Sequence, residues 1–148
     1  MKPIIETRQA EKLYQVGDST IHAVDGINLQ VEKGEFLCIS GRSGSGKSTL
    51  LSLLAGLESP TAGEIEILGQ HLEQLIEKER SRFRRAHIGF VFQSYNLLPK
   101  TTALENVELP LLYNPAFSSR ERREKAMNAL NAVGLSDRIN HRSNQMSG

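Results

Sequence analysis

The sequence predicts an α/β fold organised around a glycine-rich loop, with an antiparallel β meander ahead of the loop and a helical subdomain behind it. Three observations carry this prediction: the pattern G-x-x-x-x-G-K-[ST] at residues 41–48, alternating apolar and polar residues before it, and two helix-capping patterns after it. With 148 residues, the chain is long enough to form a hydrophobic core. We expect an α/β core with the β subdomain over residues 1–93 and the helical subdomain over residues 94–148.

The pattern at residues 41–48 is typical of a loop that binds the phosphates of a nucleoside triphosphate. Glycines allow a tight turn whose backbone N–H groups converge on phosphate oxygens, and the helix beginning near Lys47 adds the positive end of its dipole. We expect Lys47 to reach the β- and γ-phosphates, the Ser48 hydroxyl to coordinate Mg²⁺, and Thr49 to hydrogen-bond a phosphate oxygen. The predicted nucleotide-binding residues are Gly41, Arg42, Ser43, Gly44, Ser45, Gly46, Lys47, Ser48 and Thr49.

The residues on either side of this loop argue against an accidental match in a surface turn. The apolar run at residues 35–40 is expected to be a buried strand, and Cys38 within it to be a small buried thiol. Behind the loop, a buried helix is predicted by Leu50, Leu51, Leu53, Leu54 and Leu57. A strand, a glycine loop and a helix in this order are the context that the motif requires.

Further strands are predicted in the first 93 residues. Residues 4–14 and 27–31 are expected to be strands that form the antiparallel meander together with residues 35–40. Residues 64–68 alternate as another strand. Residues 88–92 form a continuous apolar run, which is typical of a strand buried on both faces and delivers Gln93 at its end.

A basic helix is predicted over residues 73–85. Its arginines could form a stripe for nucleic acid, but the formal net charge of +1 favours a solvated face balanced by the acidic residues of the same helix. We therefore expect no nucleic-acid partner. The four histidines, at positions 22, 71, 87 and 141, lack metal-ligand spacing. No apolar run approaches the length of a membrane span, which predicts a cytoplasmic protein that can still bind a membrane partner.

Two helices are predicted in the second part of the chain. Residues 102–105 and 118–121 each have the capping-box spacing, in which a hydroxyl and a carboxylate satisfy each other's backbone donors. The second helix is expected to end at the glycine C-cap Gly134. Its predicted buried residues are Ala126, Leu130 and Val133.

Along its whole length the sequence resembles the ATP-binding subunit of an ATP-binding cassette (ABC) transporter. Residues 41–51, 88–93 (IGFVFQ), 96–99 (NLLP) and 102–110 (TALENVELP) are most similar to the branch that serves lipoprotein release, macrolide export and cell division. The phosphate loop alone is generic, whereas these segments in this order are highly specific. The resemblance implies the P-loop NTPase fold of an ABC ATPase, with ATP and Mg²⁺ as cofactors.

The resemblance implies roles for residues outside the loop. Tyr14 matches the aromatic residue that stacks on adenine, with an ordinary strand tyrosine as the alternative. Gln93 matches the glutamine that meets Mg²⁺ and the attacking water, so that Gln93 and Lys47 would be catalytic. Leu97 and Leu98 would contact a membrane permease, which implies a peripheral position on the cytoplasmic face of the cell membrane.

The C-terminal end departs from the family pattern. The signature Leu-Ser-Gly-Gly-Gln begins as Met146-Ser147-Gly148, where the sequence stops before the Walker B aspartate, the general-base glutamate and the switch histidine. We expect an N-terminal portion of the full domain, marginally stable alone and without efficient turnover. In the family two cassettes pair head to tail, so Ser147 and Gly148 would contact the nucleotide on a second subunit.

The predicted function is that of the ATP-binding subunit of an export or extraction system, which couples ATP binding and hydrolysis to substrate movement through a permease. One alternative is a non-catalytic ATP-binding fragment of such a subunit. Another is an ABC ATPase of DNA repair or chromosome organisation, which the permease-type residues 96–110 and the small net charge disfavour. A GTPase is disfavoured because no N-K-x-D pattern occurs. The transported molecule and the transporter subgroup are not specified by the sequence.

Overall fold

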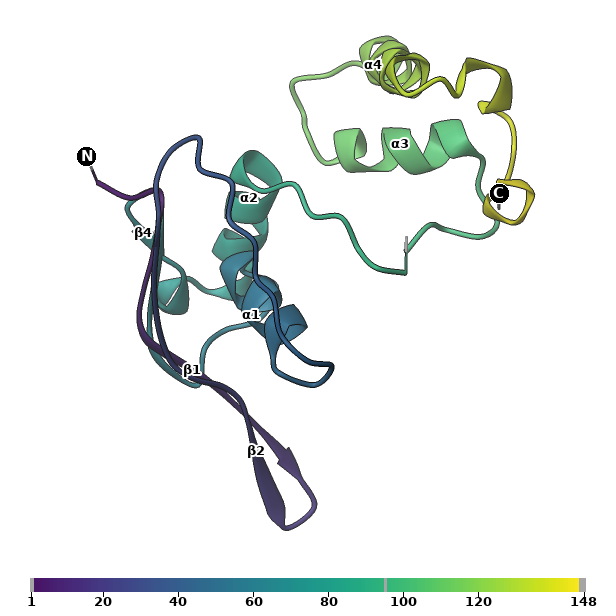
Figure 1. Cartoon of the computed structure of the whole chain (residues 1–148). Coiled ribbons are helices and arrows are strands. Elements are labelled where there is room, and N and C mark those ends of the chain that lie inside the picture. The colour runs from purple at the N-terminus through teal and green to yellow at the C-terminus, as the bar shows by residue number, and fades with distance from the viewer. Residues whose placement is uncertain (1, 95, 147–148) are drawn as a thin grey trace. The chain divides into compact units, whose positions relative to one another are not determined.

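The computed structural model describes residues 2–94 and 96–146, and the chain divides into two compact units, Met1–Phe90 and Val91–Gly148 (Figure 1). The first unit contains β1 (Ile5–Val16), β2 (Ser19–Val31), α1 (Lys47–Leu54), β3 (Ala62–Ile67), β4 (Gln70–His71), the 3₁₀ turn η1 (Leu72–Gln74) and α2 (Glu77–His87). The second contains α3 (Ala103–Leu112), α4 (Ser119–Ala132) and the 3₁₀ turns η2 (Ser136–Arg138) and η3 (Ser143–Gln145).

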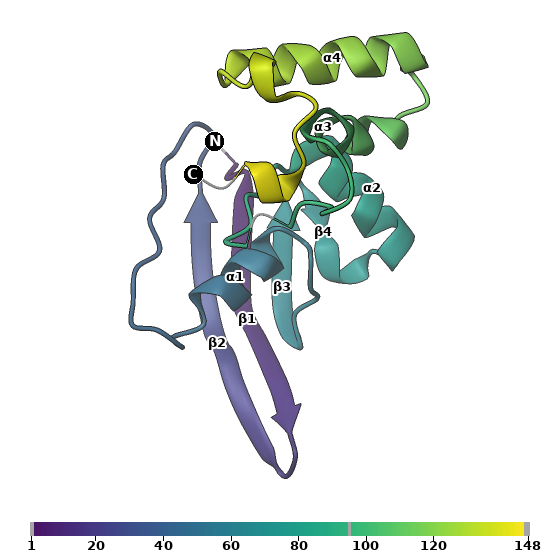
Figure 2. The same cartoon turned by 90° about the vertical axis from the view of Figure 1, so that its right-hand side faces the viewer.

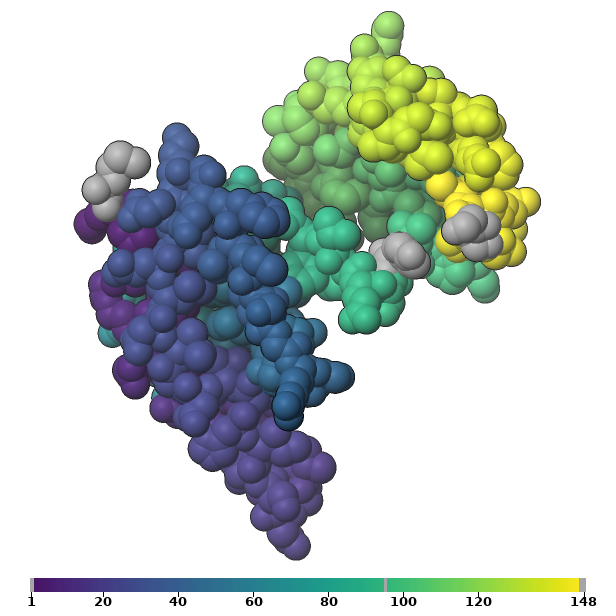
Figure 3. Space-filling view, viewed as in Figure 1, coloured from purple at the N-terminus to yellow at the C-terminus, as the bar shows by residue number. Residues whose placement is uncertain are grey.

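The sheet of the first unit has the order β2-β1-β3-β4, with antiparallel neighbours. β1 and β2 form a long hairpin that pairs Ile5 with Val31 at one end and Val16 with Ser19 at the other. Figure 3 shows the turn end of this hairpin, in purple, extending beyond the rest of the first unit. The strands predicted at residues 4–14, 27–31 and 64–68 are confirmed.

The core of the first unit lies between one face of the sheet and the two helices α1 and α2 (Figures 1 and 2). Ala10, Leu53 and Ile65 are fully buried there, and Phe83 of α2 packs against the same cluster. Of the leucines predicted to form a buried helix, Leu53 is buried, whereas Leu51 is 46% exposed. The helix α1 therefore rests on the sheet along a narrow stripe rather than being buried all round.

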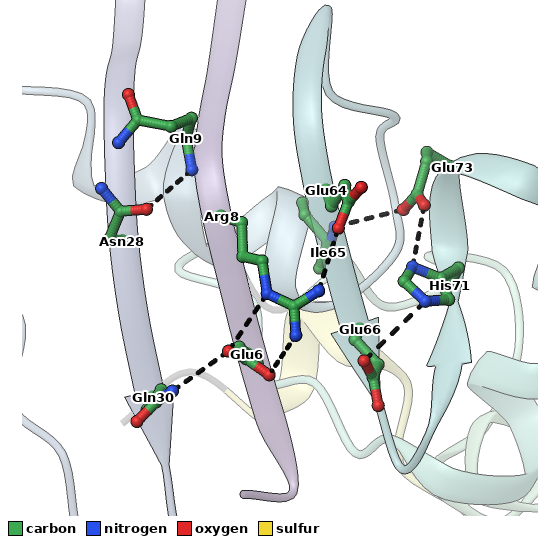
Figure 4. A network of polar contacts seen from close by, with 10 residues as sticks. All are labelled: Glu6, Arg8, Gln9, Asn28, Gln30, Glu64, Ile65, Glu66, His71 and Glu73. Atoms are coloured by element: carbon green, nitrogen blue, oxygen red, sulfur yellow. Dashed lines mark hydrogen bonds and ion pairs between the residues drawn. The ribbon is translucent and has the colours of Figure 1, made fainter.

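The opposite face of the sheet carries a polar network (Figure 4). Arg8 on β1 donates to Glu6 on the same strand, at 2.9 Å, and to Glu64 on β3, at 3.1 Å. Gln30 on β2 donates to Glu6 as well, at 3.0 Å. Because side chains alternate along a strand, Thr7 and Ile65 turn to the buried face between these polar residues. This alternation fixes which face of the sheet receives α1.

Two predicted strands are not strands in the structure. Residues 35–40 and 88–92 have irregular backbone; Phe36 is 94% exposed, Val91 is 96% exposed, and Cys38 is exposed instead of buried. A strand exists only where neighbouring backbone groups complete its hydrogen-bond ladder. In the described part of the chain no strand pairs with either segment. Apolar composition alone was therefore insufficient for the prediction.

The basic helix also differs from its prediction. α2 begins at Glu77, after the η1 turn and an extended Leu75 and Ile76, so residues 73–76 are outside the helix. Arg80 and Arg84 are not on a solvated face, because their side chains are only 13% and 22% exposed. Both pair with Glu77; Arg84 also donates to the carbonyl of Gly56 at 2.6 Å, and Arg80 to the Ser59 hydroxyl. These arginines hold the segment that follows α1.

The second unit packs α3 against α4, and both predicted capping boxes are confirmed. At the start of α3, the Thr102 hydroxyl accepts from the Glu105 N–H at 3.2 Å, and Ser118 and Glu121 form the same box at the start of α4. The core contains Ala103, Leu104, Ala126 and Leu130. Val133, predicted to be buried, is 68% exposed because it caps α4; the next residue, Gly134, has the left-handed φ of +74° expected of a C-cap.

Candidate nucleotide-binding site

The predicted phosphate loop forms the entry to α1. Gly46 is the N-cap residue in the left-handed conformation, with φ of +82°, and no side chain caps the helix. The N–H groups of the first turn of α1 therefore donate no hydrogen bond to a capping side chain. A helix N-terminus with uncapped donors and a positive dipole end attracts anions. The phosphate-binding role of residues 41–49 stays a prediction, and this helix start has the donors that such a role requires.

The glycine at position 46 is required by close backbone packing as well as by its φ angle. A Cβ added to Gly46 would lie 1.9 Å from the carbonyl oxygen of Ala23 on β2. A Cβ added to Gly44 would have nothing within 4 Å, although Gly44 also has a positive φ, of +78°. The loop is thus pressed against β2 at Gly46 and open at Gly44, which leaves the middle of the loop accessible to a ligand.

The Lys47 ammonium lies at the centre of the loop. Its Nζ donates to the carbonyl of Gly41 at 2.9 Å, to the carbonyl of Arg42 at 2.7 Å and to the hydroxyl of Ser45 at 3.4 Å. These three acceptors hold the charge where the loop backbone converges. Phosphate oxygens entering the loop would compete with neutral carbonyls for this ammonium, and charge-assisted hydrogen bonds are the stronger ones. The position predicted for Lys47 is therefore suited to binding an anion.

A pocket of 350 Å³ adjoins the loop within the first unit. Loop residues Ser45, Gly46 and Lys47 line one side, and β2 residues from His22 to Asp25 line another. The volume is within the range of small-molecule sites, about 300–1,000 Å³. The sequence analysis missed the β2 residues, because only the folded hairpin brings residues 22–25 beside a loop that begins 16 positions after Asp25.

The Ser48 hydroxyl is a suitable oxygen donor for the predicted Mg²⁺. Ser48 is exposed in the first turn of α1 and follows Lys47 in the sequence. Mg²⁺ prefers hard oxygen ligands and is commonly held by one or two protein groups together with substrate phosphates. A serine hydroxyl beside bound phosphates is a ligand set of this kind. Ser48 fits that requirement. Among the described residues, no group of three or more His, Cys, Asp and Glu could hold a metal ion.

Tyr14 lies on β1, close to Thr49 in the first turn of α1. Its hydroxyl donates to Glu58 at 2.7 Å, and Thr49 also interacts with that hydroxyl. Burial and the contact with Glu58 raise the pKa of Tyr14, while Thr49 acts in the opposite direction. The structure thus brings Tyr14 and the loop residue Thr49 together within the first unit.

Other predicted site residues belong to the second unit. Gln93 is exposed there, and Leu97 and Leu98 are 46% and 44% exposed, as a contact surface requires. Ser147 and Gly148 lie outside the described residues. No described helix is long and apolar enough to cross a membrane.

The sequence is similar to known proteins along its whole length. Residues 24–148 match the ABC transporter family. An uncharacterized ABC transporter ATP-binding protein of Thermotoga maritima is 45% identical over 148 residues, which are 100% of this chain and 63% of the relative. The lipoprotein-releasing system ATP-binding protein LolD of Psychrobacter arcticus is 43% identical over 100% of this chain and 66% of its own length.

Solved structures of the ATP-binding cassette MJ0796 are also similar. The dimeric post-hydrolysis state bound to ADP and Pi has a TM-score of 0.90 and 43% identity, covering 97% of this chain and 63% of that one. A second dimeric structure of MJ0796 also has a TM-score of 0.90, with 44% identity. The chain thus spans about two thirds of the length of these relatives. It belongs to the ABC transporter family, and its fold is that of the family's ATP-binding cassette.

Proposed function

We propose that the chain binds Mg-ATP as part of an ABC transporter subunit that couples ATP binding and hydrolysis to export or extraction of a substrate. One observation carries the proposal: the Lys47 ammonium is held in the loop by three acceptors at distances of 2.7–3.4 Å. The helix that begins at this loop has no side-chain cap. A fixed positive charge and free backbone donors together match a polyphosphate.

The chemistry that we propose for these residues is charge stabilisation and positioning. Phosphoryl transfer depends mainly on holding the phosphates and neutralising developing charge. Lys47 and the loop N–H groups would hold the phosphates, and Ser48 would ligate Mg²⁺, which supplies further neutralisation of phosphate charge. Gln93 would orient the attacking water and meet the metal. The alternative, binding without turnover, uses the same Lys47 and loop contacts and differs only in the hydrolytic step.

The proposed partners are a membrane permease and a second cassette. Leu97 and Leu98 support the permease contact, because both are large apolar side chains left exposed beside the start of α3. Relatives include macrolide export ATP-binding/permease proteins, in which both functions are named for one chain. The similar MJ0796 structures are dimeric, which supports a pair of cassettes. In such a pair, Ser147 and Gly148 would contribute to the nucleotide site of the second cassette. These partners would place the protein on the cytoplasmic face of the membrane.

Calorimetric titration with Mg-ATP tests the proposal. Lys47→Ala should weaken binding by at least about tenfold, because charge-assisted hydrogen bonds to phosphate are lost. Lys33→Ala is the matched control, since Lys33 is an exposed lysine in the turn after β2 and should leave binding unchanged. Equal affinity of the wild type and Lys47→Ala for Mg-ATP would contradict the proposal.

A further inference from the structure

A polar cluster surrounds the hydroxyl of Tyr14. The hydroxyl donates to Glu58 Oε2 at 2.7 Å, and the Lys12 ammonium lies 3.3 Å from the same oxygen. Lys12 also donates to the carbonyl of Ser59 at 2.8 Å and lies over the Tyr14 ring, 5.4 Å from its centroid. The Lys12 side chain is 17% exposed and that of Glu58 35%. The three side chains therefore form a partly desolvated unit rather than a solvated surface pair.

This cluster is connected to the phosphate loop through α1. Glu58 lies just after α1, where the N–H groups of Leu57 and Glu58 donate to the carbonyl of Ser52 at 2.9 and 3.4 Å. The helix that begins at Lys47 thus ends beside the carboxylate that receives the Tyr14 hydroxyl. Thr49, in the first turn of α1, interacts with the same hydroxyl. The Tyr14 hydroxyl thus contacts Glu58 in the segment after α1 and interacts with Thr49 in the first turn of α1.

We propose that Glu58 and Lys12 are positioning residues that hold the Tyr14 ring at a fixed place relative to the phosphate loop, so that the ring binds the base of the nucleotide. This inference rests on the proposed function, because it assumes that the phosphates occupy the loop. The Lys12 ammonium lies over one face of the ring, and the proposal assigns the opposite face to the planar base. Its positive charge also balances the Glu58 carboxylate, so the cluster presents no net charge to the base.

Anchoring matters here because Tyr14 lies near the free end of a long hairpin. Its neighbours Val16 and Ile21 are 59% and 49% exposed, so packing restrains this end weakly. A side chain already held in its binding orientation loses less conformational freedom when the ligand arrives. The hydrogen bond to a carboxylate is of the stronger, charge-assisted kind. The cluster therefore supplies the restraint that packing does not.

A double-mutant cycle on Tyr14 and Glu58 tests this inference. Tyr14→Phe keeps the ring and removes the donor, whereas Glu58→Ala removes the acceptor. Each should weaken ATP and ADP binding by about tenfold, and the double variant should be no weaker than either, because one shared interaction is lost. Tripolyphosphate, which has no base, should bind all these variants as it binds the wild type. Glu64→Ala is the matched control, a carboxylate on β3 that pairs with Arg8 at 3.1 Å and should leave ATP binding unchanged.

A spectroscopic titration of Tyr14 gives a second readout that a general loss of stability would not mimic. The chain has three tyrosines and no tryptophan, so replacing Tyr95 and Tyr113 by Phe leaves Tyr14 as the only phenol. In this background Glu58→Ala should lower the pKa of Tyr14, because Glu58 raises it. An unchanged phenol titration would show that the Tyr14–Glu58 contact is not formed in solution and would overturn the inference.

The two proposals fail in different ways. Wild-type protein that binds neither ATP nor tripolyphosphate contradicts the proposed function and this inference with it. Wild-type protein that binds both, while Glu58→Ala and Tyr14→Phe bind ATP equally well, contradicts the inference alone. Additive losses in the double variant, or parallel losses for tripolyphosphate, would likewise overturn the positioning role.

Discussion

At the scale of single residues, the loop combines positions that the motif specifies with contacts that only the fold reveals. The lysine and the glycines at 41 and 46 are recognisable from their spacing. The reason why position 46 has no room for a side chain is the carbonyl of Ala23, 23 residues earlier in the chain. Tyr14 could be singled out by resemblance, but its hydroxyl contact with Glu58 could not, because the two are separated by 44 positions.

Replacing each of two loop glycines by alanine should distinguish the loss of stability caused by backbone strain from the loss caused by a steric clash. Gly46 and Gly44 have similar positive φ angles, +82° and +78°, so Cβ strain of roughly 1–2 kcal/mol is common to both variants. Only Gly46→Ala adds a Cβ at 1.9 Å from the Ala23 carbonyl. We expect urea unfolding to show a clearly larger loss of stability for Gly46→Ala than for Gly44→Ala. Equal losses would show that the packing of the loop against β2 does not contribute.

At the scale of elements, predictions succeeded where local patterns determine the outcome. The capping boxes at Thr102 and Ser118 use residues three positions apart, so the starts of α3 and α4 could be read directly. The prediction of strands at residues 35–40 and 88–92 was wrong, because a strand depends on distant partners that a local apolar run does not reveal. Arg80 and Arg84 were assigned to solvent for the same reason: the Ser59 hydroxyl and the Gly56 carbonyl that accept from them are more than 20 positions away.

The pH dependence of the free energy of unfolding should show the contribution of the Glu77 carboxylate, which pairs with Arg80 and Arg84 on α2. Hydrogen bonds from Arg80 and then Arg84 lower the pKa of Glu77 to about 2, from its ordinary value of 4.5. A lowered carboxyl pKa stabilises the folded state above the unfolded-state value, and this contribution is lost as the pH falls between those two values. Thermal unfolding of the wild type and Glu77→Gln should therefore differ most near neutral pH. The difference should shrink below about pH 4.5 and vanish near pH 2. A difference that is independent of pH would contradict this role for Glu77.

At the scale of the whole molecule, residues with different proposed roles belong to different compact units. The first unit contains the loop, the adjoining pocket and Tyr14, so it has the residues proposed to bind the nucleotide. The second contains Gln93 and the exposed Leu97 and Leu98, which we propose to act in catalysis and in permease binding. Sequence motifs predicted both sets of residues. How the second set acts on the first depends on the arrangement of the units and could not be read from local patterns.

The most direct test of the central claim is to follow the backbone amide signals of residues 41–49 by nuclear magnetic resonance while nucleotide is added. Mg-ATP and tripolyphosphate should both shift these signals strongly, because their phosphates accept from the loop N–H groups. Adenosine should leave the loop amides nearly unchanged. If Mg-ATP binds but its largest shifts lie outside residues 41–49, or if adenosine shifts the loop as strongly as ATP does, the loop is not the phosphate site.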